Sequence, residues 1–315
     1  MHFRKFIWPG IWVSLALAVI FLSFSIFNQL YISPPRAGTS QAQHSSSEME
    51  NNDTPSGKSG DEVQDTIALP IIMYHGLVKD PSQQNQYFIS PDRFEQDLAY
   101  LQEQGYSTVT MKQLINYVHQ GTPLPEKPIV LTFDDGFYNN YLYAFPLLKQ
   151  YDEKAVISIL GSQTDRYSLI KINNSYYSYL TWNQINEMIL SGHVEIQNHT
   201  YDMHTYDQGR KGCSEKSGES TTAYREKMLE DVGLLQQKIT DYTGTTPNTI
   251  AYPFGYYSKE SEAVIKEMGF QASLTCSQKV NKISRDPNSL YRLGRFLRPP
   301  DKSSASFFKD ILKDT

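Results

Sequence analysis

The sequence predicts an α/β fold for residues 68–315, a distorted (β/α)7-type barrel preceded by a transmembrane helix and a disordered tether. Short apolar runs alternate with segments of helical periodicity, a pattern typical of a parallel sheet covered by helices. About seven such runs occur, which favours a barrel over an open sheet. Carboxylate and imidazole side chains directly follow several of the runs.

Residues 6–27 are apolar and carry no charge. A helix of roughly 20 residues crosses the hydrocarbon core of a bilayer, so this segment predicts a transmembrane signal anchor. Arg4 and Lys5 precede it, which predicts a cytoplasmic tail at residues 1–5 and a single-pass protein of the cell membrane with the rest of the chain outside. A cleaved signal peptide is the alternative, but residues 28–32 offer no small-residue exit.

Residues 28–67 predict a disordered extracellular tether, because they are mostly polar and contain few aromatic residues. The formal net charge is −5, and without Arg4 and Lys5 the exported part carries −5 − 2 = −7. This acidic balance gives no support for binding to nucleic acid. Cys213 and Cys276 both fall in the exported part, where a disulfide is stable, and the sequence leaves open whether they form one.

The predicted domain is built from strands and helices in alternation. Strands are expected at 69–74, 128–133, 154–160, 194–198, 249–254, 271–275 and 290–296. Helices are expected at 91–104, about 140–150, 181–191, 221–242 and 258–268, from apolar spacings of three and four and from serine and glycine at their ends.

Asp134 and Asp135 follow the apolar run 128–131 almost directly, and Gly136 comes next. Adjacent side chains on extended backbone point to opposite sides, so the two carboxylates are expected to serve different roles. One can hold a cation while the other takes a proton. An Asp-Gly turn with a purely structural role is the alternative.

His199 and His204 follow the run 194–198 and are five positions apart, a spacing that only a loop or turn brings together. Imidazole is a common zinc ligand, and two imidazoles with one carboxylate form the ligand set of a hydrolytic zinc site. His75 follows the first strand, at the same edge of the predicted barrel, where catalytic residues gather. The alternative for each histidine is a packing or surface role.

The TFDDG stretch at 132–136 resembles the first motif of the NodB-type polysaccharide deacetylases, carbohydrate esterase family four. His199 and His204 resemble its second motif, with the spacing found in poly-N-acetylglucosamine deacetylases. The resemblance covers roughly residues 68–298. It implies that Asp135, His199 and His204 are the metal ligands and that Asp134 is the catalytic base.

Residues 251–255 are similar to the third motif of the family, but Ala251 stands where an arginine is usual. Arg295 or Arg298, from a later strand, is expected to replace that arginine beside Asp134. The backbone amide of Phe254 is the expected stabiliser of the oxyanion. Tyr252 and Arg295 are also expected near the oxyanion or the substrate.

No histidine follows His204, although the family usually has a late histidine as its catalytic acid. The stretch that contains His75 resembles the circularly rearranged branch, in which an early histidine takes that role. The resemblance therefore implies that His75 is the acid.

The predicted function is that of a metal-dependent hydrolase that removes N-acetyl groups from N-acetylglucosamine-containing cell-wall or extracellular polysaccharide. The expected partners are peptidoglycan or poly-N-acetylglucosamine and, through the anchor, the membrane. Zinc is the first choice of metal, with cobalt, nickel or manganese as alternatives. Two other functions stay open: an O-acetyl polysaccharide esterase with the same site, and an inactive membrane-tethered module that binds the wall.

Overall fold

The computed structural model describes residues 66–313, which belong to one compact unit, Asp61–Thr315. The predicted cytoplasmic tail at 1–5, the anchor at 6–27 and nearly all of the tether at 28–67 lie outside the described residues. None of the helices within residues 66–313 is both long and apolar enough to cross a membrane.

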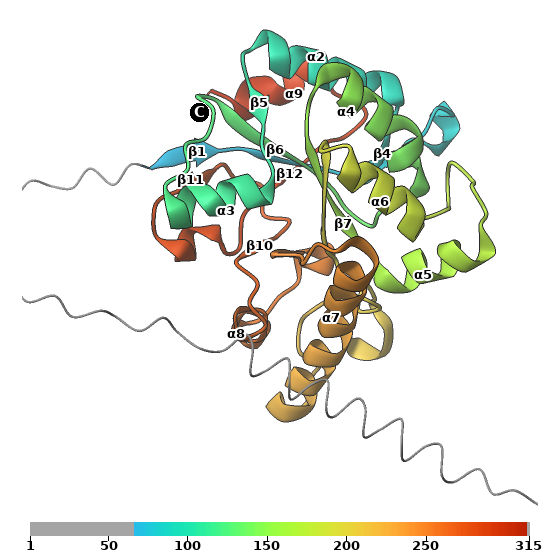
Figure 1. The fold of residues 1–315 in the computed structure, drawn as a ribbon, viewed down its shortest axis with the longest axis vertical. Coiled ribbons are helices and arrows are strands. Elements are labelled where there is room, and N and C mark those ends of the chain that lie inside the picture. Colours follow the sequence, from blue (N-terminus) through green and yellow to red (C-terminus); the bar gives the residue numbers. More distant parts are fainter. Residues whose placement is uncertain (1–65, 314–315) are drawn as a thin grey trace, which may run out of the picture. The chain divides into compact units, whose positions relative to one another are not determined.

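A curled parallel sheet forms the centre of the domain (Figure 1). Its strand order is β10-β9-β8-β7-β6-β2-β12, with β5 added beside β6. The strands are β2 (Ile71–Tyr74), β5 (Ser107–Thr108), β6 (Pro128–Phe133), β7 (Ala155–Ile159), β8 (Val194–Asn198), β9 (Thr249–Ala251), β10 (Ala272–Leu274) and β12 (Phe296–Leu297). All six residues of β6 are buried, as expected for a parallel strand covered on both faces.

Residues 293–298 form a closing segment that bonds to strands at both ends of the sheet order, β10 and β2. Leu293 exchanges hydrogen bonds with Ser273 and Thr275 beside β10, at 2.8 Å each. A few residues later β12 pairs in parallel with β2, and the Arg298 amide donates to the Met73 carbonyl at 3.0 Å. The sheet is therefore curled in a way that is consistent with the predicted (β/α)7 barrel.

Two predicted strands were placed incorrectly. The run 290–296 was expected to be extended, but Pro287–Leu290 forms a 3₁₀ helix and Arg292 has a φ of 59°, which interrupts a strand. Only β12 remains extended there. The run 249–254 stops at Ala251, because Pro253 has no amide hydrogen for a ladder and Phe254 has a φ of 57°.

The five predicted helices are present, close to their expected bounds. They are α2 (Pro91–Glu103), a π-helical turn (Asn140–Ala144) continued by α4 (Phe145–Tyr151), α6 (Trp182–Leu190), α7 (Thr221–Thr243) and α8 (Lys259–Glu267). Side-chain caps explain several starts. The Ser90 hydroxyl accepts from the Arg93 amide, and Thr181 forms a capping box with Gln184.

Three helices were not predicted: α3 (Met111–Gln120), α5 (Gly161–Ile170) and α9 (Ser304–Ile311). The capping box of Thr110 with Gln113 is a signal that would have found α3. In contrast, α5 has no side-chain cap. Figure 1 shows α9 beside α2, where Tyr100 and Phe308 stack at 5.7 Å between ring centres.

The remaining elements are short and lie around the ends of the sheet. β1 (Ile67–Leu69) pairs antiparallel with β11 (Asn281–Ile283), and β3 (Gly76–Leu77) pairs in parallel with β4 (Phe88–Ile89). Short 3₁₀ turns occupy Pro81–Gln83, Asp207–Gly209 and Pro253–Gly255. Because β2, β6, β7, β8 and β9 are all parallel, their carboxyl ends lie together on one side of the sheet, across the strand direction.

Candidate active site

Asp134 and Asp135 follow the end of β6 with different backbone conformations. The Asp134 amide still donates to the Tyr74 carbonyl of β2 at 3.0 Å, which continues the strand pairing. Asp135 then takes a φ of 71° and Gly136 a φ of 71°, so the chain reverses at once. A Cβ at Gly136 would lie 2.9 Å from Ile159 Cγ2, which leaves no room for another residue in this turn.

The two predicted histidines come together at the end of β8. The His199 amide donates to the Ile159 carbonyl at 3.1 Å, and Thr200 then adopts a φ of 75° that turns the chain toward His204. The Nδ1 atom of His199 lies 2.7 Å from the Ala251 carbonyl. Because a carbonyl only accepts, Nδ1 carries the proton, and the lone pair of Nε2 is free to coordinate.

Asp135, His199 and His204 form a group with the geometry of a metal site. The Nε2 atoms of His199 and His204 lie 3.5 and 3.4 Å from Asp135 Oδ1, and one donor atom of each residue lies within 4.8 Å of the other two. Asp135 Oδ1 is buried and has no hydrogen-bond partner within residues 66–313. One carboxylate oxygen and two imidazole nitrogens are a ligand set that suits Zn²⁺, so these residues fit the expected cation.

Electrostatics in this group also favour a cation. Burial and the neighbouring Asp134 carboxylate raise the pKa of Asp135 to about 8. Burial lowers the pKa of His199 to about 3, so its ring is neutral, as a metal ligand must be. A divalent cation between the three side chains would supply the positive charge that the buried Asp135 carboxylate lacks.

Arg295, the residue before β12, binds Asp134 through two hydrogen bonds. Its Nη1 and Nη2 donate to Asp134 Oδ1 and Oδ2 at 2.6 and 2.8 Å, and its Nε donates to the Thr275 carbonyl at 3.0 Å. Both side chains are buried. Burial alone would raise the pKa of Asp134, but the guanidinium outweighs it and holds that pKa below its ordinary value.

Arg298 has a different partner. Its Nε and Nη2 donate to the two carboxylate oxygens of Asp97 on α2, at 2.8 and 2.9 Å, and the Tyr74 hydroxyl donates to the same carboxylate at 3.1 Å. Of the two arginines considered for the place beside Asp134, Arg295 therefore occupies it.

His75 follows β2 and lies at the same cavity. Its ring centre is 4.8 Å from that of Tyr87, and its Nδ1 is buried without a hydrogen-bond partner among the described residues. Burial lowers the pKa of His75 to about 4, against the opposing effect of the Asp134 carboxylate. The ring is thus neutral at pH 7 in the free cavity.

A cavity of about 420 Å³ contains Asp134, His75 and the three candidate ligands. Aromatic rings form much of its wall. The centre of the Phe254 ring lies 4.1 Å from the ring centre of His204 and 4.2 Å from that of Tyr206. Lining residues that the sequence did not single out as site residues are Met73, Tyr87, Phe88, Phe137, Tyr206, Cys276, Gln278 and Leu297. Nothing in their sequence context marks them, because they come from strands and loops far apart in the chain.

Tyr252 does not reach this cavity. Its side chain is fully buried in a core cluster with Met203, Cys213 and Tyr224, so the expectation that it lies near the substrate is not met. The two cysteines are free in the structure, so the disulfide that the sequence left open is not formed. Cys213 is buried, whereas Cys276 lines the cavity.

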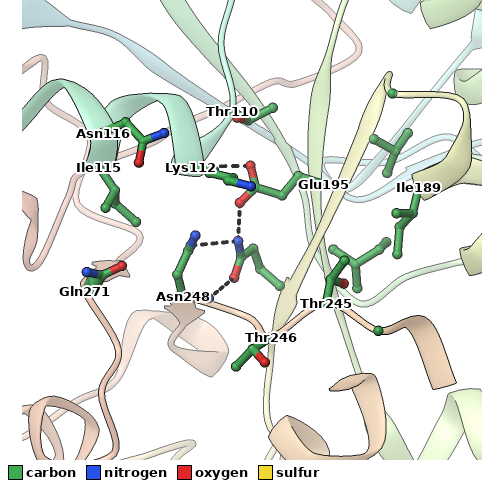
Figure 2. Close-up of a pocket in the computed structure, with 15 residues that line it drawn as sticks. Thr110, Lys112, Ile115, Asn116, Ile189, Glu195, Thr245, Thr246, Asn248 and Gln271 are labelled. Carbon is green, nitrogen blue, oxygen red and sulfur yellow. Dashed lines mark hydrogen bonds between the residues drawn. The ribbon is translucent and has the colours of Figure 1, made fainter. Parts of the chain in front are cut away.

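A second cavity, of about 720 Å³, lies near the amino end of β8 and holds none of the predicted site residues (Figure 2). Its main polar groups are paired with each other. Glu195 accepts from the Lys112 amide at 3.2 Å and from the Gln197 side chain, while Gln197 Oε1 accepts from the amides of Asn248 and Thr249 at 3.0 and 2.9 Å. This network ties α3 and the start of β9 to β8, which is a structural role.

Comparison with known proteins agrees with the motifs. The sequence profile of the family "Polysaccharide deacetylase" matches residues 121–273, which contain Asp134, Asp135, His199 and His204. YxkH of Bacillus subtilis (strain 168), assigned to polysaccharide deacetylases, is 29% identical over 239 residues, which is 76% of this chain and 74% of that protein. The chain therefore contains a polysaccharide deacetylase domain.

Relatives of this chain include enzymes named for one polymer. The poly-β-1,6-N-acetyl-D-glucosamine N-deacetylase of Escherichia coli (strain K12) is 25% identical over 224 residues, 65% of this chain but only 33% of that protein. The structure of IcaB from Ammonifex degensii matches with a TM-score of 0.62 and 27% identity, and the match covers 74% of this chain and 93% of that one. The predicted family and its poly-N-acetylglucosamine deacetylase-like neighbours are thus confirmed.

Proposed function

We propose that this deacetylase is a metal-dependent hydrolase that removes N-acetyl groups from a polysaccharide containing N-acetylglucosamine. The observation that carries the proposal is the buried Asp135 Oδ1. It has no hydrogen-bond partner in the part of the chain that the structure describes, and it lies 3.5 and 3.4 Å from the Nε2 atoms of His199 and His204. Burying a carboxylate oxygen without a partner is costly, and a cation held by these three side chains removes that cost.

Asp135, His199 and His204 would hold the cation, with Zn²⁺ as the first choice and Co²⁺, Ni²⁺ or Mn²⁺ as alternatives. When bound, the cation supplies Lewis-acid chemistry, polarising the carbonyl under attack and favouring ionisation of water at neutral pH.

In the proposed reaction Asp134 takes the proton of the attacking water. Its two oxygens each accept one N–H from Arg295, and each keeps lone-pair capacity for a further hydrogen bond. Arg295 therefore fixes the orientation of the carboxylate and keeps it ionised. The Phe254 amide is the proposed donor to the oxyanion, since the Phe254 ring packs against His204 at the cavity.

His75 is the proposed acid that delivers a proton to the leaving amine. Because burial lowers the pKa of His75 to about 4, its ring is neutral in the free cavity at pH 7. The ring must therefore take up a proton before it can act as an acid. The Asp134 carboxylate is the nearby negative charge that favours this uptake.

For the substrate we propose poly-N-acetylglucosamine, with peptidoglycan as the other candidate polymer. Two relatives, from Escherichia coli and Staphylococcus aureus, are named for poly-β-1,6-N-acetyl-D-glucosamine. Aromatic rings such as Tyr206 and Tyr256, which are 56% and 40% exposed, line the cavity and offer flat apolar faces to sugar rings.

For the location we propose a single-pass protein of the cell membrane with this site outside. The support is the sequence of residues 6–27 with Arg4 and Lys5 before it.

Acetate release tests the function. The full-length protein is assayed with N-acetylglucosamine oligomers and with wall polymer, after chelation and again after addition of Zn²⁺. Asp134→Asn and His199→Ala are compared with His193→Ala, a histidine outside the cavity that contacts the Glu153 carbonyl. We expect metal-dependent release that is lost in the first two variants and kept in the third.

Other outcomes separate the alternatives. Binding of polymer without acetate release, unchanged in Asp134→Asn, contradicts the enzyme and identifies a wall-binding module. Acetate release that leaves a free hydroxyl on the sugar, and no free amine, identifies an O-acetyl esterase.

A further inference from the structure

The loop between the two candidate histidine ligands is held in place from outside the cavity. His199 and His204 are five residues apart, so neither a helix nor a strand sets their relative positions. The loop that joins them begins with Thr200 at a φ of 75°. The site of His204 thus depends on whatever fixes the backbone of this loop.

Asp231, on α7, makes the contacts that fix it. The side chain is buried, and its Oδ1 accepts from the Tyr201 amide at 2.8 Å. The Asp202 amide donates to both carboxylate oxygens, at 3.3 and 3.0 Å. Asp231 does not line the catalytic cavity.

A second helix holds the other side of the same loop. At the start of α5 the Gly161 amide donates to the Thr200 carbonyl at 3.2 Å, and the Ser162 amide donates to the Tyr201 carbonyl at 2.9 Å. Asp231 thus accepts hydrogen bonds from the N–H groups of Tyr201 and Asp202, and the first amides of α5 donate to the carbonyls of Thr200 and Tyr201.

We propose that Asp231 is a positioning residue of the metal centre, whose carboxylate fixes the loop so that His204 Nε2 stays beside Asp135. A buried carboxylate is costly unless strong hydrogen bonds compensate it, and here both oxygens are used on the histidine loop. An asparagine offers one acceptor oxygen where the loop presents two amides to two oxygens. This inference rests on the metal site of the proposed function.

Glu153 provides a matched control. It is also a buried carboxylate, and its Oε2 accepts from the Thr108 amide at 3.1 Å. It lies before β7, at the opposite end of the sheet from the cavity. Glu153→Gln therefore removes the same kind of interaction without touching the histidine loop.

The test measures metal binding rather than turnover. In the full-length protein, Zn²⁺ affinity is measured by competition with a chromophoric chelator, and the absorption spectrum of the Co²⁺-substituted protein reports ligand geometry. For Asp231→Asn we expect Zn²⁺ affinity to fall by about 10–100-fold, with an altered Co²⁺ spectrum, as for other groups that orient metal ligands. For Glu153→Gln we expect lower thermal stability with unchanged affinity and spectrum.

An unchanged affinity and spectrum in Asp231→Asn overturn the proposal, and so does an equal loss of affinity in Glu153→Gln. If Asp231→Asn does not fold, Asp231→Glu, which keeps the charge, is judged by the same two measurements. Wild-type protein that binds no Zn²⁺ overturns this inference and the proposed function together. Wild-type protein that binds Zn²⁺ but releases no acetate contradicts the proposed function alone.

Discussion

Arg295 and Arg298, three residues apart in the closing segment of the sheet, each form a buried pair with an aspartate. Arg295 binds Asp134 in the catalytic cavity, and Arg298 binds Asp97 on α2, each with two hydrogen bonds. Both arginines are fully buried. The pairs have similar geometry and burial, but only the first contacts a proposed catalytic group.

This similarity gives a matched pair of substitutions, Arg295→Lys and Arg298→Lys. Lysine keeps the charge but cannot form two parallel hydrogen bonds with a carboxylate, so each variant is expected to lose about 1–3 kcal/mol of stability. Only Arg295→Lys is expected to lower kcat, by about 10²-fold, because it misplaces Asp134. Thermal unfolding and acetate release, at a temperature where both variants are folded, check this; an equal fall in kcat for both would contradict it.

Protonation of His75 is expected to make the free energy of unfolding depend on pH. Its pKa is about 4 in the folded chain and ordinarily 6.5, so between these values the unfolded chain binds a proton that the folded chain does not. The free energy of unfolding therefore falls as pH is lowered from 7 toward 4. His75→Gln cannot take up this proton and is expected to lose less stability between pH 7 and 5, by on the order of 1–2 kcal/mol.

Urea unfolding of the metal-free protein at the two pH values measures this difference. Identical pH dependence in wild type and His75→Gln would show that His75 is not held in its neutral form by burial.

At the scale of elements, α5 depends on tertiary structure for its start. It has no side-chain cap, and its first amides are satisfied by the carbonyls of the loop between His199 and His204. That is why sequence signals missed the helix. The same contact explains Gly161, where a Cβ would lie 2.4 Å from Tyr201 Cδ2.

Gly161→Ala and Gly233→Ala are expected to change stability in opposite directions. The first forces the histidine loop away from α5, at a cost of about 1–3 kcal/mol, and weakens metal binding. Gly233 lies inside α7, where the nearest atom to a new Cβ is Met268 Cε at 3.7 Å, so alanine is expected to stabilise by about 0.5–1 kcal/mol. Thermal unfolding of both variants checks the signs.

At the scale of the whole domain, the proposed metal site joins segments that are distant in sequence. Asp135 follows β6, whereas His199 and His204 follow β8, so a cation held by all three links two strands of the sheet. A ligand that binds only the folded chain stabilises it, by about 2.7 kcal/mol at a concentration 100 times its Kd.

Removal of the cation is therefore expected to lower Tm by roughly 5–10 °C for a domain of this size. Differential scanning calorimetry with and without a chelator measures the shift. His199→Ala serves as the control, since chelator should leave its Tm nearly unchanged. An equally large shift in this variant would place the stabilising cation elsewhere.

Most of the fold was predictable because alternating apolar runs and helical periodicity are local signals. The buried strand β6 and the capped helix α6 carry such signals within their own residues. The segment 290–296 was wrongly predicted to be one strand. Arg292 has a positive φ, and the chain pairs with β10 at Leu293 and with β2 from Phe296 on, which local sequence does not encode.

The sequence by itself indicated the chemistry of the site, since Asp134, Asp135 and His199 follow apolar runs closely and His204 comes five residues after His199. Parallel strands bring such ends to one edge, which is a general property of the fold. Only the tertiary structure decided that Arg295, and not Arg298, holds Asp134, and that Asp231 fixes the histidine loop. These partners lie 161 and 30 residues from the groups they contact, and no local propensity encodes a hydrogen bond across such distances.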